Sequence, residues 1–407
     1  KRMNQTNTIG ASDFFNRIGS LADIRRPSIG PSGEVVGSSK NCLSNVCACY
    51  SRWMNFGISR RSALIGSAAL SLASAAKAVP GREDMRLRIL PTRVYRSVFN
   101  ARENMDGWVL FLILETIEQQ SFRPISLHIS YRADGIVVRE DRISGAALNG
   151  VARQDISPSR LTGQTPNPPV YWPQAFRVHC YVPHEPVISD LLFELRLADA
   201  KGRVHRISLQ TPIIDYEQRT ALIFPFRGPG IISQAGVLGG GHRNRSGAFA
   251  LDAIGLAANH APMLKAGSDR PQDYAGWGRS IIAPADGIIV NARNDRPDQP
   301  KDGESNPAYY APEYPNGGDV GNNVVIDHGN NEFSLIAHMR MGSVRVRSGE
   351  RVTQGQQLGE LGNSGDTSGP HVHYQLQNGP RWEYADGLPM RFTNVSGLAR
   401  GSYFDAS

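Results

Sequence analysis

Short apolar runs separated by turn-forming residues dominate two stretches of the chain, residues 85–215 and 250–377. Segments such as WVLFLILE and ISLHISY end in clusters of Asn, Asp or Gly. Runs of this length, bounded by turn residues, predict strands rather than helices. Glycine (42 residues) and proline (26 residues) are also more frequent than helical bundles allow. The chain of 407 residues is therefore predicted to be all-β.

The net charge of +7 belongs to the first residues of the chain. Residues 1–78 hold ten Lys and Arg residues against three Asp and Glu residues, whereas residues 79–407 are balanced. A nucleic-acid-binding domain would need a basic face on its folded part. We therefore expect no nucleic-acid partner.

Residues 54–78 have the layout of an export signal. Arg60 and Arg61 precede a run rich in Ala, Leu and Ser that ends in Ala76-Lys77-Ala78, an A-x-A cleavage pattern. The arginine pair resembles a twin-arginine signal, with general export as the alternative. We expect residues 1–53 to be an over-extended reading frame or a disordered N-terminus, with Met54 as the start. The expected location is the periplasm or cell envelope, without a stable membrane span.

The rest of the chain is predicted to form two domains. Residues 79–225, with short strands at regular spacing, are predicted to form a β-sandwich of unknown role, in which residues 157–173 are a loop. Residues 226–400 are predicted to form a second β domain with long loops, including a strand at residues 343–349, and residues 401–407 a tail. After cleavage only one cysteine, Cys180, remains, because Cys42, Cys47 and Cys49 precede Met54. We therefore expect no intramolecular disulfide.

Two histidines stand two residues apart in the segment SGPHVHYQL. On a strand, His371 and His373 would face one side, while Val372, Tyr374 and Leu376 would face the core. Zinc binds neutral imidazole nitrogens and carboxylate oxygens. The pair therefore indicates a metal or catalytic site, and a solvated strand face is the alternative.

The segment from Asn322 to Gln377 resembles the catalytic core of the LytM/lysostaphin-type zinc metallopeptidases, peptidase family M23. The shared features are the strand ending in Ala337-His338, the valine- and glycine-spaced turn from Val346 to Gln356, the turn Gly362-Asn-Ser-Gly, and the run Gly369-Pro-His-Val-His. The resemblance implies an antiparallel β-sheet metallopeptidase domain after the N-terminal β-sandwich, with Zn²⁺ as the cofactor.

By position, the resemblance implies that His242, Asp252 and His373 bind zinc and that His338 and His371 are the two catalytic histidines. Nine residues separate His242 from Asp252, whereas three are usual in the family. His260 is the nearby alternative to His242, and His328 is expected to be structural.

The function implied by the resemblance is that of an exported zinc metalloendopeptidase. It would hydrolyse peptide bonds in peptidoglycan cross-links through zinc-activated water and two catalytic histidines, one as the proton acceptor and one at the oxyanion. The sequence does not assign these two roles. The alternatives are a non-catalytic cell-wall binding or regulatory module on the same fold, and a zinc peptidase with a protein substrate. Serine hydrolysis has little support, because Ser364 lacks a strand-to-helix context. The expected partners are peptidoglycan stem or cross-link peptides, and the oligomeric state is left open.

Overall fold

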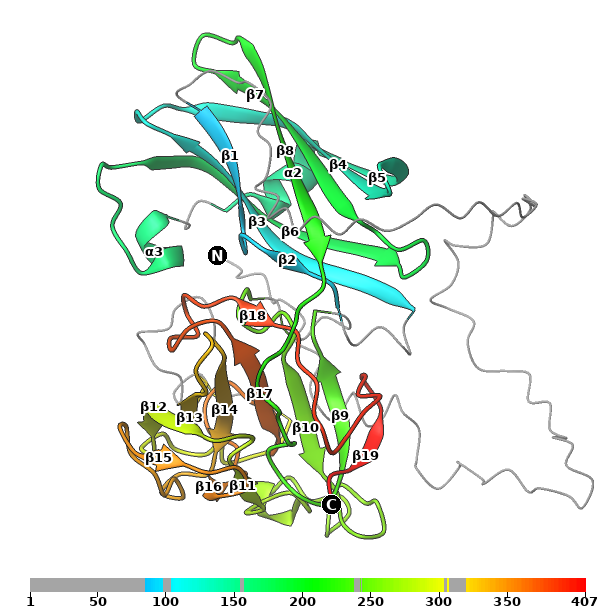
Figure 1. Cartoon of the computed structure of the whole chain (residues 1–407), viewed down its shortest axis with the longest axis vertical. Helices are drawn as coiled ribbons and strands as arrows, with labels where there is room; N and C mark the ends of the chain where they lie inside the picture. Colours follow the sequence, from blue (N-terminus) through cyan, green and yellow to red (C-terminus); the bar gives the residue numbers. More distant parts are fainter. Residues whose placement is uncertain are drawn as a thin grey trace, which may run out of the picture. The chain divides into compact units, whose positions relative to one another are not determined.

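The computed structural model describes residues 85–97, 104–153, 157–237, 242, 244–303, 306 and 320–407. Strands and their connecting loops make up almost all of these residues (Figure 1), which confirms the all-β prediction. The expectations for residues 1–78, including the export signal, the start at Met54 and three of the four cysteines, lie outside the described residues. No helix within the described ranges is long and apolar enough to cross a membrane.

Residues 85–214 form two sheets around one hydrophobic core, as predicted for a β-sandwich. One sheet has the strand order β1-β3-β6 and the other β2-β8-β7-β4-β5; β2 and β8 are parallel, and the other pairs are antiparallel. Alternate residues such as Leu110 and Leu112 of β3 and Phe193 of β7 fill the core. The elements are β1 (Met85–Leu90), β2 (Val94–Tyr95), β3 (Met105–Thr116), β4 (Phe122–Ala133), β5 (Ile136–Ser144), α2 (Gly145–Val151), α3 (Pro158–Thr162), β6 (Tyr171–Pro183), β7 (Asp190–Asp199) and β8 (Val204–Ile214).

Two parts of this domain differ from the sequence analysis. β5 was not predicted, because it is an edge strand whose sequence IVVREDRIS is charged and largely exposed. The loop predicted for residues 157–173 is wrong at both ends, since helix α3 forms at its beginning and β6 starts at Tyr171. The Ser157 side chain accepts a hydrogen bond from the Arg160 N–H, and Pro158 occupies the first helical turn. These are standard helix-start features that the surrounding prolines obscured.

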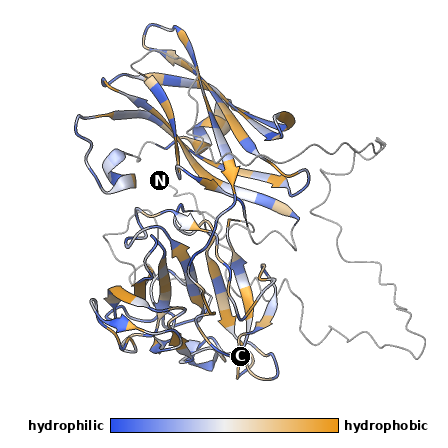
Figure 2. Ribbon diagram, viewed as in Figure 1, coloured by the Kyte–Doolittle hydropathy of each residue, from blue (hydrophilic) through white to orange (hydrophobic). Residues whose placement is uncertain are grey.

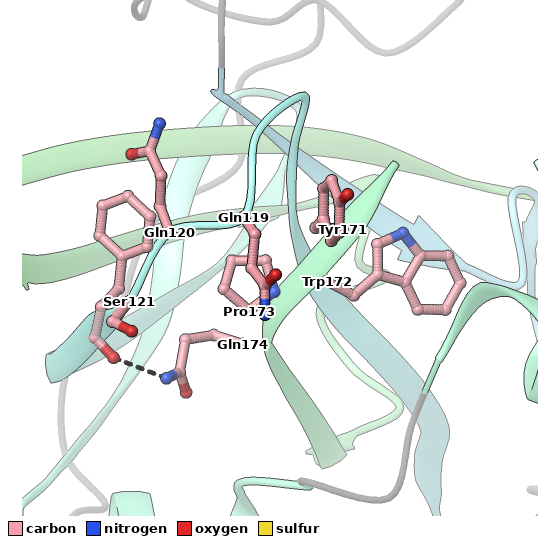
Figure 3. A pocket seen from close by; sticks show the side chains of 8 residues that line it. Gln119, Gln120, Ser121, Tyr171, Trp172, Pro173 and Gln174 are labelled. Carbon is pink, nitrogen blue, oxygen red and sulfur yellow. Dashed lines mark hydrogen bonds between the residues drawn. The ribbon is translucent and has the colours of Figure 1, made fainter. Parts of the chain in front are cut away.

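A surface pocket lies beside the start of β6 (Figure 3). Amide and aromatic side chains line it, and Gln174 Nε2 donates to the Phe122 carbonyl at 2.7 Å. The Trp172 indole Nε1 donates a hydrogen bond to Glu115 Oε2 at 3.2 Å. None of the site residues predicted from the sequence lines this pocket. It is therefore not the site that the histidines indicate.

A long antiparallel sheet organises residues 229–405. Its order is β15-β12-β13-β14-β17-β10-β9-β19, with β18 paired to β17, and β11 and β16 form a separate pair. The elements are β9 (Pro229–Ala235), β10 (Leu251–Gly255), η2 (Pro271–Asp273), β11 (Ser280–Ile282), β12 (Gly287–Arg293), β13 (Asn322–Asp327), β14 (Phe333–Met339), β15 (Arg351–Val352), β16 (Gln357–Glu360), β17 (Val372–Gln377), β18 (Gly387–Leu388) and β19 (Tyr403–Asp405).

The two faces of β10 and β17 have different chemistry. One face packs into the second hydrophobic core through Leu251 and Ala253 of β10 and Val372, Tyr374 and Leu376 of β17. Figure 2 shows hydrophobic positions interspersed with hydrophilic ones along the strands, whose connecting loops are largely hydrophilic. Since side chains alternate along a strand, Asp252, His373 and Gln375 lie on the opposite face. This polar face carries the candidate site.

Two segments of the second domain also differ from expectation. The strand predicted for residues 343–349 is absent: Val346 packs into the core, and the one backbone hydrogen bond from this segment to β16 runs from Arg345 N to the Leu358 carbonyl (2.8 Å), while the Ser343 hydroxyl accepts from Glu360 N at 3.1 Å. Residues 401–407, set apart as a tail, include β19, which pairs with β9. The two hydrophobic cores use separate stretches of chain apart from Tyr95. The domain boundary near residue 225 stays a prediction.

The hairpin between β13 and β14 holds a buried carboxylate, Glu332. This side chain accepts hydrogen bonds from the Tyr216 hydroxyl (2.6 Å) and from the backbone N–H groups of Arg219 (2.8 Å) and Thr220 (2.7 Å). Burial alone would raise the pKa of Glu332, but these bonds outweigh it and lower the pKa. Glu332 thereby anchors the segment that follows β8.

Candidate metal centre and its histidines

Adjacent strands bring Asp252 and His373 together. They are register partners in the antiparallel pair of β10 and β17. Both side chains project from the polar face, and His373 Nδ1 lies 3.0 Å from Asp252 Oδ1. The main sequence-based expectation for β17, that His373 faces away from the core, is met because Val372 and Tyr374 are buried on the other side.

His242 approaches the same carboxylate from a separate segment. Its Nε2 lies 3.1 Å from Asp252 Oδ1, and its ring centroid is 4.9 Å from that of His373. The segment that follows is held by Arg245, whose buried guanidinium lies 2.7 Å from Asp386 Oδ1. The structure therefore brings His242, Asp252 and His373 together despite the long spacing between the first two.

The three side chains have the chemistry and spacing of a zinc site. One ligand atom from each lies within 4.8 Å of the others, and this is the single cluster of its kind within the described ranges. Two ligand atoms about 2.1 Å from a tetrahedral zinc ion would be about 3.4 Å apart. The observed 3.1 and 3.0 Å separations from Asp252 Oδ1 are close to that value. The residues therefore fit zinc.

A bulge in β14 turns His338 toward this cluster. Ile336 packs into the second core, so strict alternation would send His338 into that core as well. Instead His338 has a φ of +59°, and Met339 takes the next place in the core. Such a conformation is uncommon outside glycine, and bulges of this kind re-aim side chains next to functional sites. The His338 ring lies 4.8 Å from that of His371 and 5.9 Å from that of His373.

Backbone carbonyls fix the orientation of both remaining histidines. His338 Nδ1 lies 2.8 Å from the Ser364 carbonyl, and His371 Nδ1 lies 2.8 Å from the Gly369 carbonyl. Because a carbonyl only accepts, each Nδ1 carries the proton in the neutral ring. The two Nε2 atoms are then free acceptors, and that of His371 is 3.6 Å from Asp252 Oδ1.

The ionisation of the site follows from its burial and its three imidazoles. Burial alone would raise the pKa of Asp252, but the charges and hydrogen bonds of His242, His371 and His373 outweigh it and hold this pKa well below its usual range. Burial, followed by the neighbouring His371 and His373, holds the pKa of His338 well below its usual value. The metal-free site thus pairs an ionised carboxylate with a neutral His338.

Ser364 supports the site through its backbone and its hydroxyl. The hydroxyl is fully buried, donates to the Met339 carbonyl (2.7 Å) and accepts the Asn322 N–H (2.9 Å). These bonds fix the turn that contains the Ser364 carbonyl, which accepts a hydrogen bond from His338 Nδ1. The sequence analysis set Ser364 aside as a nucleophile but missed this supporting position, because no local pattern pairs it with Met339.

The other histidines of the sequence analysis lie elsewhere. His260 is an exposed turn residue with a φ of +63° and does not join the cluster. His328 is bonded to the Asp286 carbonyl through Nδ1 and to the Ser334 hydroxyl through Nε2, each at 2.7 Å, which suits a structural residue. In the first domain, His128, His184 and His205 each pair with nearby carboxylates.

Comparison with known proteins agrees with this geometry. Residues 272–384 match peptidase family M23. The chain contains an M23 peptidase domain. The matched range includes His338, His371 and His373, whereas His242 and Asp252 precede it and rest on the geometry above.

Relatives of the M23 domain include two proteins of Vibrio cholerae. The peptidoglycan DD-endopeptidase ShyA is 43% identical over 99 residues, which cover 24% of this chain and 17% of that protein. The peptidoglycan DD-endopeptidase ShyC is 45% identical over 60 residues, which cover 14% of this chain and 13% of that protein. The chain thus spans less than a fifth of the length of these relatives.

The chain is also similar to a solved structure. It is the catalytic domain of the prophage-encoded M23 protein EnpA from Enterococcus faecalis, which is 20% identical and covers 42% of this chain and 94% of that chain. Its TM-score of 0.27 is too low to add to the assignment.

Proposed function

We propose that this chain is an exported zinc metalloendopeptidase that hydrolyses peptide bonds in peptidoglycan cross-links. The observation that carries the proposal is the convergence of five side chains, His242, Asp252, His338, His371 and His373, at the polar face of one sheet. The M23 match and the names of ShyA and ShyC support the reaction and the substrate class. The signal-like residues 54–78 support export.

His242 Nε2, Asp252 Oδ1 and His373 Nδ1 are the atoms that would hold the metal. Zinc, when bound, makes hydroxide available at neutral pH and polarises a carbonyl group. One carboxylate and two neutral imidazoles leave the ion with a net positive charge. This charge suits a site where negative charge develops on the substrate oxygen.

His338 and His371 supply the proton transfers. Each ring has its Nδ1 proton committed to a backbone carbonyl, so each presents Nε2 as a proton acceptor. A ring that accepts a proton at Nε2 can pass it to the leaving amine nitrogen. The other ring, whose centroid is 4.8 Å away, can bind the developing oxyanion once its own Nε2 is protonated, because in the neutral ring this nitrogen has no proton to donate.

The test is hydrolysis of purified peptidoglycan by the zinc-loaded chain, followed by mass analysis of the released peptides. We expect new amino groups at the cut bond. We expect His371→Ala to keep its zinc and to lose about 10²–10⁴-fold in turnover, the usual contribution of acid–base catalysis. His260→Ala is the control and should match the wild type.

Three results would contradict the proposal. Full turnover by His371→Ala would refute the role of that residue. Loss of zinc in His260→Ala would move the metal ligand from His242 to His260. A zinc-loaded chain that binds peptidoglycan without cutting it would replace the enzyme with the binding module.

A further inference from the structure

Two buried glutamines continue the polar face of β17 behind the proposed metal ligand His373. Side chains two residues apart on a strand share a face, so His373, Gln375 and Gln377 form one row. Their exposed fractions are 9%, 2% and 0%, respectively. Buried amides are costly unless they are hydrogen-bonded, and these two are bonded to each other and to the groups at either end.

The row is a continuous chain of hydrogen bonds. His373 Nε2 lies 2.9 Å from Gln375 Oε1, and Gln375 Nε2 donates to Gln377 Oε1. Gln377 Nε2 donates in turn to the Gly379 carbonyl at 2.7 Å. At the other end of the row, His373 Nδ1 faces Asp252 Oδ1 at 3.0 Å.

The Gly379 carbonyl sets the direction of every bond in the row. A carbonyl can only accept, so the Gln377 amide must point its nitrogen at Gly379 and its oxygen at Gln375. Gln375 must then offer its own oxygen to His373. That oxygen requires a proton on His373 Nε2, so Nδ1, which faces the acceptor Asp252 Oδ1 at 3.0 Å in the metal-free site, is the atom that would bind the metal.

We propose that Gln375 and Gln377 are positioning residues that fix His373 in its Nε2–H tautomer, with Nδ1 as the metal-binding atom; this inference rests on the proposed zinc site. A metal-binding histidine is commonly held by a partner on its other ring nitrogen, and loss of such a partner costs about 10–100-fold in metal affinity. Here the partner is a neutral amide, so the site keeps the net positive charge described above.

The Gly379 carbonyl acts on the metal position through three side chains. The tautomer of His373 is therefore decided at the far end of β17, rather than by the metal. Binding then requires no relocation of a proton within the ring. Binding at Nδ1 would displace only a proton that this nitrogen shares with Asp252 Oδ1.

The first measurement is the tautomer of His373 in the metal-free chain. Long-range ¹⁵N–¹H NMR correlations distinguish the two tautomers, and His373→Gln assigns the resonances. We expect a proton on Nε2 in the wild type, beside any proton that Nδ1 shares with Asp252. A ring protonated at Nδ1 alone would overturn the inference, whether or not the chain binds zinc.

The second measurement is zinc affinity by competition with a chelator. We expect Gln375→Met to bind zinc about 10–100-fold more weakly than the wild type. Gln375→Glu keeps an oxygen acceptor for His373 Nε2–H but sets its other oxygen against Gln377 Oε1, so it should recover only part of the affinity. Leu376→Met, on the core face of the same strand, is the matched control and should bind as the wild type does.

The outcomes separate the two proposals. No zinc binding by the wild type would remove the proposed metal site, and the tautomer measurement would still decide the inference. Wild-type affinity in Gln375→Met would overturn the inference while leaving the metal site intact. If Gln375→Met does not fold, Gln377→Met removes the anchor of the row and should also weaken zinc binding.

Discussion

Replacing Ser364 with alanine would test the support beneath His338. The variant leaves the Asn322 N–H buried without its acceptor, since that group bonds to the Ser364 hydroxyl at 2.9 Å. The Met339 carbonyl, which also loses a bond, still accepts from Asn322 Nδ2 at 3.1 Å. A buried donor left unsatisfied costs about 1–3 kcal/mol, so we expect Ser364→Ala to lower the free energy of unfolding by about 2 kcal/mol.

The assay is urea unfolding at a fixed zinc concentration, with turnover measured on the same samples. Ser348→Ala is the control: its exposed hydroxyl donates to the Val290 carbonyl at 3.3 Å, and its loss should change stability by less than about 0.5 kcal/mol. Turnover of Ser364→Ala should fall far less than that of His371→Ala, because the carbonyl that holds His338 is retained. An unchanged unfolding midpoint would refute the reasoning. Complete loss of turnover with zinc retained would instead mark the hydroxyl as a reacting group.

Three further predictions concern buried ionisable groups. Glu332→Gln sets an amide NH₂ against the N–H groups of Arg219 and Thr220 and should lower the urea midpoint, with a cost of about 1–3 kcal/mol for a donor left unsatisfied; the exposed Glu350→Gln should not. Since the pKa of Asp252 is depressed in the metal-free chain, this group stabilises the fold above its unfolded pKa of about 3.9, and this stability is lost as the pH falls toward the folded pKa. Asp252→Asn should flatten the acid side of a metal-free stability profile, and an unchanged profile would contradict this. Burial raises the pKa of Cys180 to about 12, so peptide mapping after alkylation at neutral pH should find Cys180 unmodified in the native chain and modified in urea.

Alternation along strands predicted much of the fold and part of the site. It was sufficient for β10 and β17, where regular strands place Asp252 and His373 opposite the core. The same rule places Gln375 beside His373, so the row of amides was readable from the sequence and was overlooked. Edge strands such as β5 were not predicted, because a charged, exposed strand has no apolar face from which alternation can be recognised.

The orientation of His338 could not be read from the sequence. A period of two assigns it to the core with Ile336, and only the positive φ at His338 reverses that assignment. The choice of ring nitrogen was equally hidden, because it depends on the carbonyls of Ser364 and Gly369. Tertiary contacts of turns, rather than residue types, decide both properties.

The bulge at His338 also makes β14 intolerant of slippage. A regular strand that slides by two residues keeps every side chain on its original face, so such registers can compete. In β14, a slide in one direction would bury His338 in the place of Ile336, and a slide in the other would put Ile336 in the place of His338. A misregistered strand would therefore lose part of its core and one histidine of the candidate site together. The correct register of β14 and the assembly of the site thus depend on the same residue, His338.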